Sequence, residues 1–137
     1  MALTHIIDTS VLTRLHEPTV RKVVDELTSV GAAARAGISD LEVGYSARTA
    51  KEWDSLLDAL QAFELVETEA SHLRRARQVQ RLLATKSQRG RKLPDLLVAA
   101  AAESVGLTVL HYDADFDLIA AVTGQLCEWI VPSGSID

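Results

Sequence analysis

The stretch LPDLLVAAAAES, residues 93–104, constrains the fold of this chain more than any other part of its sequence. Pro94 is favoured in the first turn of a helix and Gly106 just after its end, so these residues predict one helix. A surface helix has a single apolar face, whereas this segment is apolar almost all round. The helix is therefore predicted to lie at the centre of the molecule, covered by other elements.

Short apolar strands alternate with helices along the rest of the chain. Residues 3–7 (LTHII) and 107–110 (LTVL) are predicted strands, and three weaker candidates are 32–36, 63–66 and 129–131. Further helices are predicted to begin at Pro18, at Ser39, near Trp53, at Ser71 and at Ala114. This alternation predicts an α/β three-layer sandwich, with a short, mostly parallel central sheet flanked by helices on both faces. We find no linker or internal repeat and expect a single domain over residues 1–137.

The charges of the chain are distributed unevenly. Nineteen Asp and Glu against fourteen Lys and Arg give a net charge of −5, which argues against a general polycation for nucleic acid. Between Ser71 and Lys92, however, six arginines and two lysines occur without an acid. Such a segment can bind a polyanion, or it can be a solvated helix face followed by a loop, and charge alone leaves both open.

Other features exclude several classes of protein. A single cysteine, Cys127, excludes an internal disulfide and a zinc site built on paired cysteines. The glycine motifs of nucleotide-binding loops and the GxSxG motif of serine hydrolases are absent. No run reaches the roughly 18 apolar residues of a membrane span, and the first residues, MALTHIIDTS, lack the features of a signal peptide. We therefore expect a cytoplasmic protein that does not bind membranes.

Acidic residues follow the predicted strands and begin the predicted helices. Asp8 ends the first strand, and Asp113 and Asp115 follow the strand LTVL. Asp95 lies in the first turn of the central helix and Glu42 in the first turn of another. Because ligands bind at the carboxyl ends of parallel strands, these five carboxylates are predicted to converge. Converging carboxylates repel unless a cation neutralises them, and oxygen ligands favour Mg²⁺ or Mn²⁺. Such a site supports phosphodiester hydrolysis by metal-activated water.

Each acid taken singly also has an ordinary structural explanation. The segment from Ser39 to Glu42 has the pattern of a capping box, in which the glutamate only bonds the backbone of the helix start. The helix dipole explains Asp95, and turn or capping roles explain the two aspartates after the strand LTVL. Asp8 is harder to explain, because an acid that ends a buried strand is costly without a partner. The recurrence of acids at such positions favours one common site.

Four motifs, in order and spacing, resemble the PIN domain and specifically the VapC-type toxins of bacterial toxin–antitoxin pairs: IIDTS, SDLEVGYSAR, LPDLLVAAAAES and HYDADFDLIA. The resemblance extends from about Leu3 to Pro132. It implies a Mg²⁺- or Mn²⁺-dependent endoribonuclease, usually a homodimer, that a small cognate antitoxin protein silences by binding across the site. It places the metal-binding and catalytic acids at Asp8, Glu42, Asp95, Asp113 and Asp115, with secondary hydroxyl contacts from Thr9 or Ser10.

One position departs from the family pattern. Many members have Thr or Ser two residues before the fourth acid, where this chain has His111, so the role of His111 stays open. Arg89, Arg91 and Lys92 precede the third acid by a few residues and are predicted to contact RNA phosphates. Two other functions also stay open. One is a non-catalytic regulatory module of PIN-like shape, against which the complete acidic set argues, and the other is a metal-dependent nuclease for DNA or branched nucleic acid.

Overall fold

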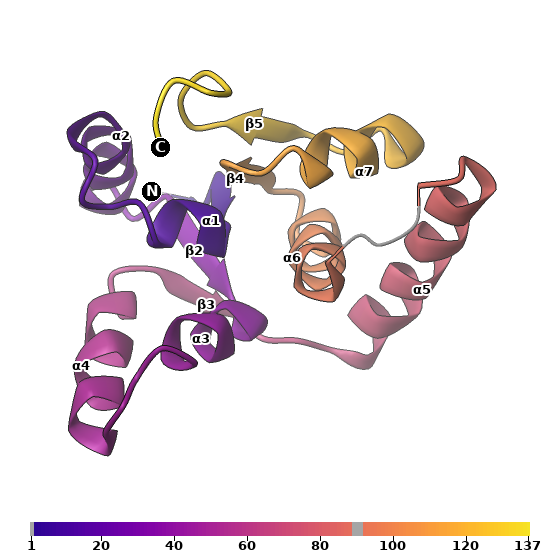
Figure 1. Cartoon of the computed structure of the whole chain (residues 1–137). Coiled ribbons are helices and arrows are strands. Elements are labelled where there is room, and N and C mark those ends of the chain that lie inside the picture. Colours follow the sequence, from indigo (N-terminus) through magenta and orange to yellow (C-terminus); the bar gives the residue numbers. More distant parts are fainter. Residues whose placement is uncertain (1, 89–91) are drawn as a thin grey trace.

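A computed structural model describes residues 2–88 and 92–137, so Arg89 and Arg91 lie outside the described residues. In the described ranges, five strands form one parallel sheet in the order β3-β2-β1-β4-β5. The strands are β1 (His5–Ile7), β2 (Ala33–Ala36), β3 (Glu64–Val66), β4 (Thr108–His111) and β5 (Cys127–Trp129). The helices are α1 (Thr9–Leu12), α2 (Pro18–Ser29), α3 (Gly37–Gly44), α4 (Ala50–Leu60), α5 (Ala70–Thr85), α6 (Leu93–Ser104) and α7 (Asp115–Thr123) (Figure 1).

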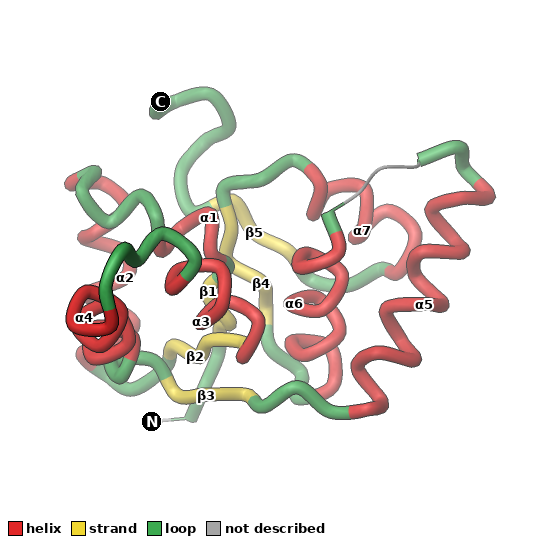
Figure 2. Tube along the Cα trace, turned by 60° about the horizontal axis from the view of Figure 1, so that its bottom comes forward, coloured by secondary structure: helices red, strands yellow, loops and turns green. Residues whose placement is uncertain are grey.

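Helices cover both faces of the sheet. Successive residues of a strand point to opposite faces, and β1 shows this with two neighbouring isoleucines. Ile6 packs in a core cluster with residues of α5, α6 and α7, whereas Ile7 packs in a second cluster with residues of α1, α2 and α4. Figures 1 and 2 show the same division, with α5, α6 and α7 on one side of the strands and α2 and α4 on the other. The predicted three-layer α/β sandwich is confirmed.

The central position predicted for the apolar helix is also confirmed. In α6, Leu96 and the run from Val98 to Ala102 are buried. The helix contacts α3, α5 and α7 as well as the three strands β1, β2 and β4. Gly106 follows its last turn with φ +70°, a left-handed conformation that glycine adopts without strain, and thereby ends the helix as predicted.

Most element boundaries differ from the predictions by one or two residues, the short helix α1 was not predicted, and two differences have a clear structural cause. The helix expected from Ser39 begins at Gly37, because β2 ends at Ala36 and the chain turns directly into α3. Ser39 therefore lies inside the helix and is fully buried. The last strand covers Cys127–Trp129 rather than 129–131, because these residues pair with Val109–His111 of β4.

The strand order places a switch point between β1 and β4. The chain runs from β1 outward through β2 to β3, and then returns to β4 and β5 on the other side of β1. The carboxyl ends of β1 and β4 therefore lie side by side where the order reverses, the usual place for a ligand in an open α/β sheet. No helix in the described part of the chain is long and apolar enough to cross a membrane.

Candidate metal centre

The carboxyl end of β1 holds Asp8 in a nearly closed environment. The residue is 2% exposed, and its Oδ2 accepts hydrogen bonds from the backbone N–H (2.9 Å) and the hydroxyl (2.6 Å) of Ser10. The Ser10 hydroxyl in turn accepts the backbone N–H of Tyr112 at 2.9 Å, which links the ends of β1 and β4. Among the described residues, Asp8 Oδ1 has no hydrogen-bond partner. Burial raises the pKa of Asp8, since the charged form loses its hydration.

Glu42 approaches the same place from α3. The Thr9 hydroxyl lies 2.7 Å from Glu42 Oε1 and 3.0 Å from the Ser39 hydroxyl. The N-cap residue of the helix is Ala36 rather than Ser39, so the capping-box explanation of Glu42 is wrong. Burial raises the pKa of Glu42, and the hydrogen bond from Thr9 opposes that rise. Glu42 is therefore held by a side chain from α1, 33 residues away in the sequence.

Asp95 is the carboxylate whose ionisation the structure disfavours most clearly. It lies in the first turn of α6, is 4% exposed, and its Oδ2 has no hydrogen-bond partner among the described residues. Burial, followed by the charges of Asp8 and Asp113, raises its pKa to about 8. At this pKa, and in the absence of a metal ion, the carboxyl is mostly protonated at neutral pH. A helix-dipole role alone would not require a buried carboxyl oxygen without a partner.

Asp113 and Asp115 follow β4 and complete the group. Asp113 Oδ1 accepts the backbone N–H of Asp115 at 2.9 Å, which is the predicted turn, while its Oδ2 accepts a hydrogen bond from Lys92 Nζ. Burial opposes the ionisation of Asp113, but the hydrogen bonds from Lys92 and Asp115 outweigh it, so its pKa lies below the usual value. One carboxylate oxygen from each of Asp95, Asp113 and Asp115 lies within 4.8 Å of the others.

The acids surround a shallow hollow of about 200 Å³. Four of the five predicted acids line it together with both predicted hydroxyl residues, one further threonine and two cations: Asp8, Thr9, Ser10, Thr13, Arg14, Glu42, Lys92, Asp95 and Asp113. The fifth acid, Asp115, joins the group through its proximity to Asp95 and Asp113. The geometry thus brings all five predicted acids to one end of the sheet, as the parallel topology implied.

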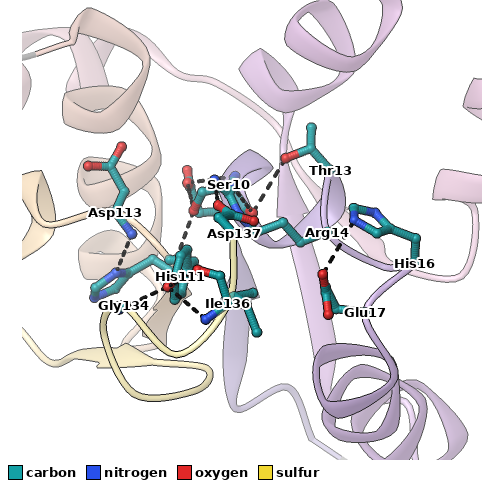
Figure 3. Close-up of polar contacts among 12 residues, drawn as sticks. Ser10, Thr13, Arg14, His16, Glu17, His111, Asp113, Gly134, Ile136 and Asp137 are labelled. Atoms are coloured by element: carbon teal, nitrogen blue, oxygen red, sulfur yellow. Dashed lines mark hydrogen bonds and ion pairs between the residues drawn. The ribbon is translucent and has the colours of Figure 1, made fainter.

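His111 lies beneath the site rather than in it. The residue is fully buried, and its Nδ1 accepts the backbone N–H of Asp113 at 3.2 Å (Figure 3). Its ring packs against Phe116 and Trp129, with centroids 4.9 and 5.0 Å away. Burial lowers its pKa, which favours the neutral form that this hydrogen bond requires. His111 therefore positions the backbone at Asp113 and is not exposed for contact with a substrate.

The acids and hydroxyl residues of this hollow offer oxygen ligands, which suit a hard divalent cation. Two buried carboxylate oxygens, Asp8 Oδ1 and Asp95 Oδ2, have hydrogen-bonding capacity that the described residues do not use. Buried polar atoms without partners are rare in proteins, and they often mark a place where an ion or a water molecule binds. The donor set therefore fits Mg²⁺ or Mn²⁺, the cations predicted from the sequence.

Two described residues of the hollow, Thr13 and Arg14, were not predicted from the sequence, and Arg14 is the charged one. It comes only four residues after Ser10, just beyond α1, and the shortness of that helix keeps it beside the end of β1. Its guanidinium donates back to the Ser10 carbonyl at 2.7 Å. A cation so soon after the motif IIDTS was the available signal, but the charge pattern drew attention to residues 71–92 instead.

Comparison with known sequences gives a consistent result. Residues 5–122 match the family model described as PIN domain. Ribonuclease VapC51 of Mycobacterium tuberculosis (strain ATCC 25618 / H37Rv) is 65% identical over 137 residues, covering 100% of both chains. Ribonuclease VapC21 of Mycobacterium tuberculosis (strain CDC 1551 / Oshkosh) is 41% identical over 137 residues, covering 98% of this chain and 99% of the relative.

Solved structures share the same architecture. DNA-bound VapBC from Salmonella typhimurium matches with a TM-score of 0.76 at 18% identity, covering 94% of this chain and 99% of that one. VapBC-5 from Mycobacterium tuberculosis matches with a TM-score of 0.60 at 23% identity, covering 96% and 98%. At these identities the likeness concerns the fold alone, and it agrees with the three-layer sheet arrangement described above.

Proposed function

The chain belongs to the PIN-domain family, and within it to the VapC-type proteins, and on that basis we propose that it is the endoribonuclease toxin of a toxin–antitoxin pair. The family predicted from the four sequence motifs is confirmed. A single observation supports the chemistry: Asp8 Oδ1 and Asp95 Oδ2 are buried without hydrogen-bond partners among the described residues, at one end of the sheet and beside three further carboxylates.

Asp8, Asp95 and Asp113 are the proposed principal metal ligands, with Asp115 and Glu42 contributing directly or through water. When bound there, Mg²⁺ or Mn²⁺ lowers the pKa of the attacking water and neutralises the charge that develops on the phosphate. The hydroxyl of Ser10 fixes the orientation of Asp8 by bonding the Oδ2 atom, and Oδ1, which has no partner among the described residues, would be available to hold the ion.

Glu42 is the proposed acceptor of the proton that the attacking water loses. Burial raises its pKa toward neutrality, which improves a carboxylate as a general base. The hydroxyl of Thr9 holds its Oε1 and so limits the positions that its side chain can take. Of the three basic residues predicted to contact RNA, Lys92 is the one that the structure describes. Its side chain is 61% exposed, is hydrogen-bonded to Asp113, and provides positive charge at the rim for an RNA phosphate.

RNA is the proposed substrate because both reported relatives are named ribonucleases. A small antitoxin is the proposed partner because the structural relatives include VapBC toxin–antitoxin complexes. An acidic hollow is readily blocked by an inserted Arg or Lys, which would pair with the carboxylates in place of the metal. We also propose a homodimer that acts in the cytoplasm, where RNA and a co-expressed antitoxin are both present.

The test is cleavage of total cellular RNA by the purified, antitoxin-free chain with Mn²⁺ and with excess chelator. We expect new ends with a 5′-phosphate and a 3′-hydroxyl in Mn²⁺ only, the result of water attack on phosphorus. Asp8→Asn and Asp95→Asn should lower the rate by orders of magnitude, whereas Asp54→Asn, an exposed change on α4, should not.

Three outcomes would contradict the proposal. Cleavage that persists in excess chelator would defeat the metal-dependent mechanism. Cleavage of DNA but not of RNA would favour the alternative nuclease, and failure to cleave either, with full binding of a small partner, would favour the regulatory module.

A further inference from the structure

Arg14 is fixed at the rim of the acidic hollow by three different contacts. Its Nη1 donates to the Ser10 carbonyl at 2.7 Å. Its Nε and Nη2 both approach Asp137 Oδ2, at 2.7 and 2.6 Å (Figure 3). The guanidinium also lies over the ring of Tyr112, 5.0 Å from its centroid. The side chain is 26% exposed and therefore lies at the surface of the hollow, within reach of a ligand.

The segment after β5 is held against the same residues that organise the site. The hydroxyl of Tyr112 accepts the backbone N–H of Gly134 at 2.9 Å and donates to the carbonyl of Ile136 at 3.0 Å. Ile136 packs against the core cluster that contains Ile7. These contacts place Asp137 beside Arg14, so their pairing is part of the fold and not a chance encounter of two free side chains.

The two described cations of the hollow are neutralised in different ways. Lys92 is paired with Asp113, an acid of the site itself. Arg14 is paired with Asp137, which lies outside the acidic cluster and is 44% exposed. A guanidinium binds a carboxylate and a phosphate through the same N–H groups, and an exposed ion pair adds little stability. The Arg14–Asp137 pair can therefore open at low cost when a phosphate is offered.

We propose that Arg14 binds a phosphate of the RNA next to the scissile one, and that Asp137 competes with that phosphate for the guanidinium. The proposal rests on the function proposed above. Arg14 is thus a substrate-binding residue that acts on affinity, and Asp137 is an intramolecular competitor that weakens affinity. A merely structural ion pair predicts something different, because loss of either partner would then have an effect in the same direction.

The experiment measures binding of a short fluorescent single-stranded oligoribonucleotide by anisotropy, in Mn²⁺ and in the inactive Asp95→Asn background. Arg14→Gln should raise the Kd roughly tenfold or more, the value of a lost hydrogen bond to a charged group. Asp137→Asn should lower the Kd about two- to fivefold, since a weak competing pair has been removed. Arg14→Lys should fall between the wild-type residue and Gln, because it keeps the charge without the planar group.

The pair Arg21 and Asp25 on α2 provides matched controls. These residues form an exposed ion pair of the same chemistry, at 3.0 Å, away from the acidic hollow. Arg21→Gln and Asp25→Asn change the net charge by the same amounts as the test variants. Each should change the Kd less than the corresponding test variant, which separates a local contact from a general effect of charge.

The outcomes separate this inference from the proposed function. Weaker binding by Arg14→Gln with tighter binding by Asp137→Asn supports it, and in cleavage assays these changes should appear in KM with little change in kcat. Weaker binding by both variants, or no change on Arg14→Gln, overturns the inference and leaves RNA cleavage untouched. If Arg14→Gln does not fold, the test relies on Asp137→Asn alone. The inference is then overturned if Asp137→Asn binds the oligoribonucleotide no more tightly than Asp25→Asn does. If the Asp95→Asn protein does not bind RNA and the wild-type chain does not cleave it, both the proposed function and this inference are overturned.

Discussion

Replacing Asp95 by Asn should stabilise the metal-free protein. The pKa of Asp95 is raised from 3.8 to about 8 by burial and by the charges of Asp8 and Asp113. At pH 7 the carboxyl is ionised in the unfolded chain and mostly protonated in the folded one, so folding requires the uptake of a proton. The cost is set by the difference between pH 7 and the pKa of 3.8 in the unfolded chain, because each unit corresponds to about 1.4 kcal/mol. Protonating Asp95 on folding therefore lowers the free energy of unfolding by roughly 4 kcal/mol at pH 7.

Asparagine is neutral in both states and avoids this cost. Its amide can also donate to Asp113, as the protonated Asp95 carboxyl does. We therefore expect metal-free Asp95→Asn to be more stable than wild type at pH 7, by up to about 4 kcal/mol. At about 2–4 °C per kcal/mol, the melting temperature should rise by several degrees. Because the pKa is raised on folding, the advantage should be absent below about pH 3.8, grow as the pH rises, and level off above about 8.

Mn²⁺ should narrow this difference in stability. An ion at a hundredfold excess over its Kd adds about 2.7 kcal/mol to the stability of the protein that binds it. Wild type should gain this increment, and Asp95→Asn should gain much less. Thermal unfolding of both proteins with Mn²⁺ and with chelator tests the reasoning, with Asp54→Asn as the exposed control. Equal gains in Mn²⁺, or a metal-free Asp95→Asn that melts below wild type at pH 7, would refute it.

Two further predictions follow from the same contacts. The affinity for Mn²⁺ should rise by up to about tenfold per pH unit below pH 8 and then level off, because the ion displaces the proton that Asp95 holds. Calorimetry at several pH values measures this affinity, and an affinity that does not change with pH would contradict the prediction. Thr9→Val should lower the free energy of unfolding by about 1–3 kcal/mol and slow RNA cleavage, because the partly buried Glu42 loses its hydroxyl partner. Thr9→Ser keeps the hydroxyl and should preserve both the stability and the cleavage rate. Chemical denaturation and cleavage assays test this, and equal effects of the two substitutions would contradict it.

The position of the acids was predictable because it depends on the topology of the sheet. Asp8 and Asp113 each follow a strand that short apolar runs identify, and adjacent parallel strands end at the same edge. Asp95 was predictable because Pro94 marks the start of the central helix. The capping-box explanation of Glu42 could not be rejected from sequence, since it requires knowledge that Thr9 lies across from it.

Contacts that depend on side-chain direction were not predictable. Arg35 lies in the middle of β2, where a charge would suggest an exposed edge, yet it is 5% exposed. It is retained there because its Nε donates to Asp40 at 2.8 Å and its Nη1 donates to the backbone carbonyls of Leu60 and Phe63. The Arg14–Asp137 pair joins residues 123 positions apart, and no periodicity in a sequence carries such information.

The proposed metal binding and the proposed antitoxin binding have the same physical cause as the stability effects predicted above. The carboxylates at the end of the sheet are neutralised in the metal-free state by Lys92, which pairs with Asp113, and by a proton on Asp95. Any cation that enters the hollow gains the attraction of these carboxylates and displaces that proton. A divalent ion and a basic side chain of an antitoxin would therefore compete for the same carboxylates. The apparent affinity of the protein for either should decrease as the concentration of the other is raised.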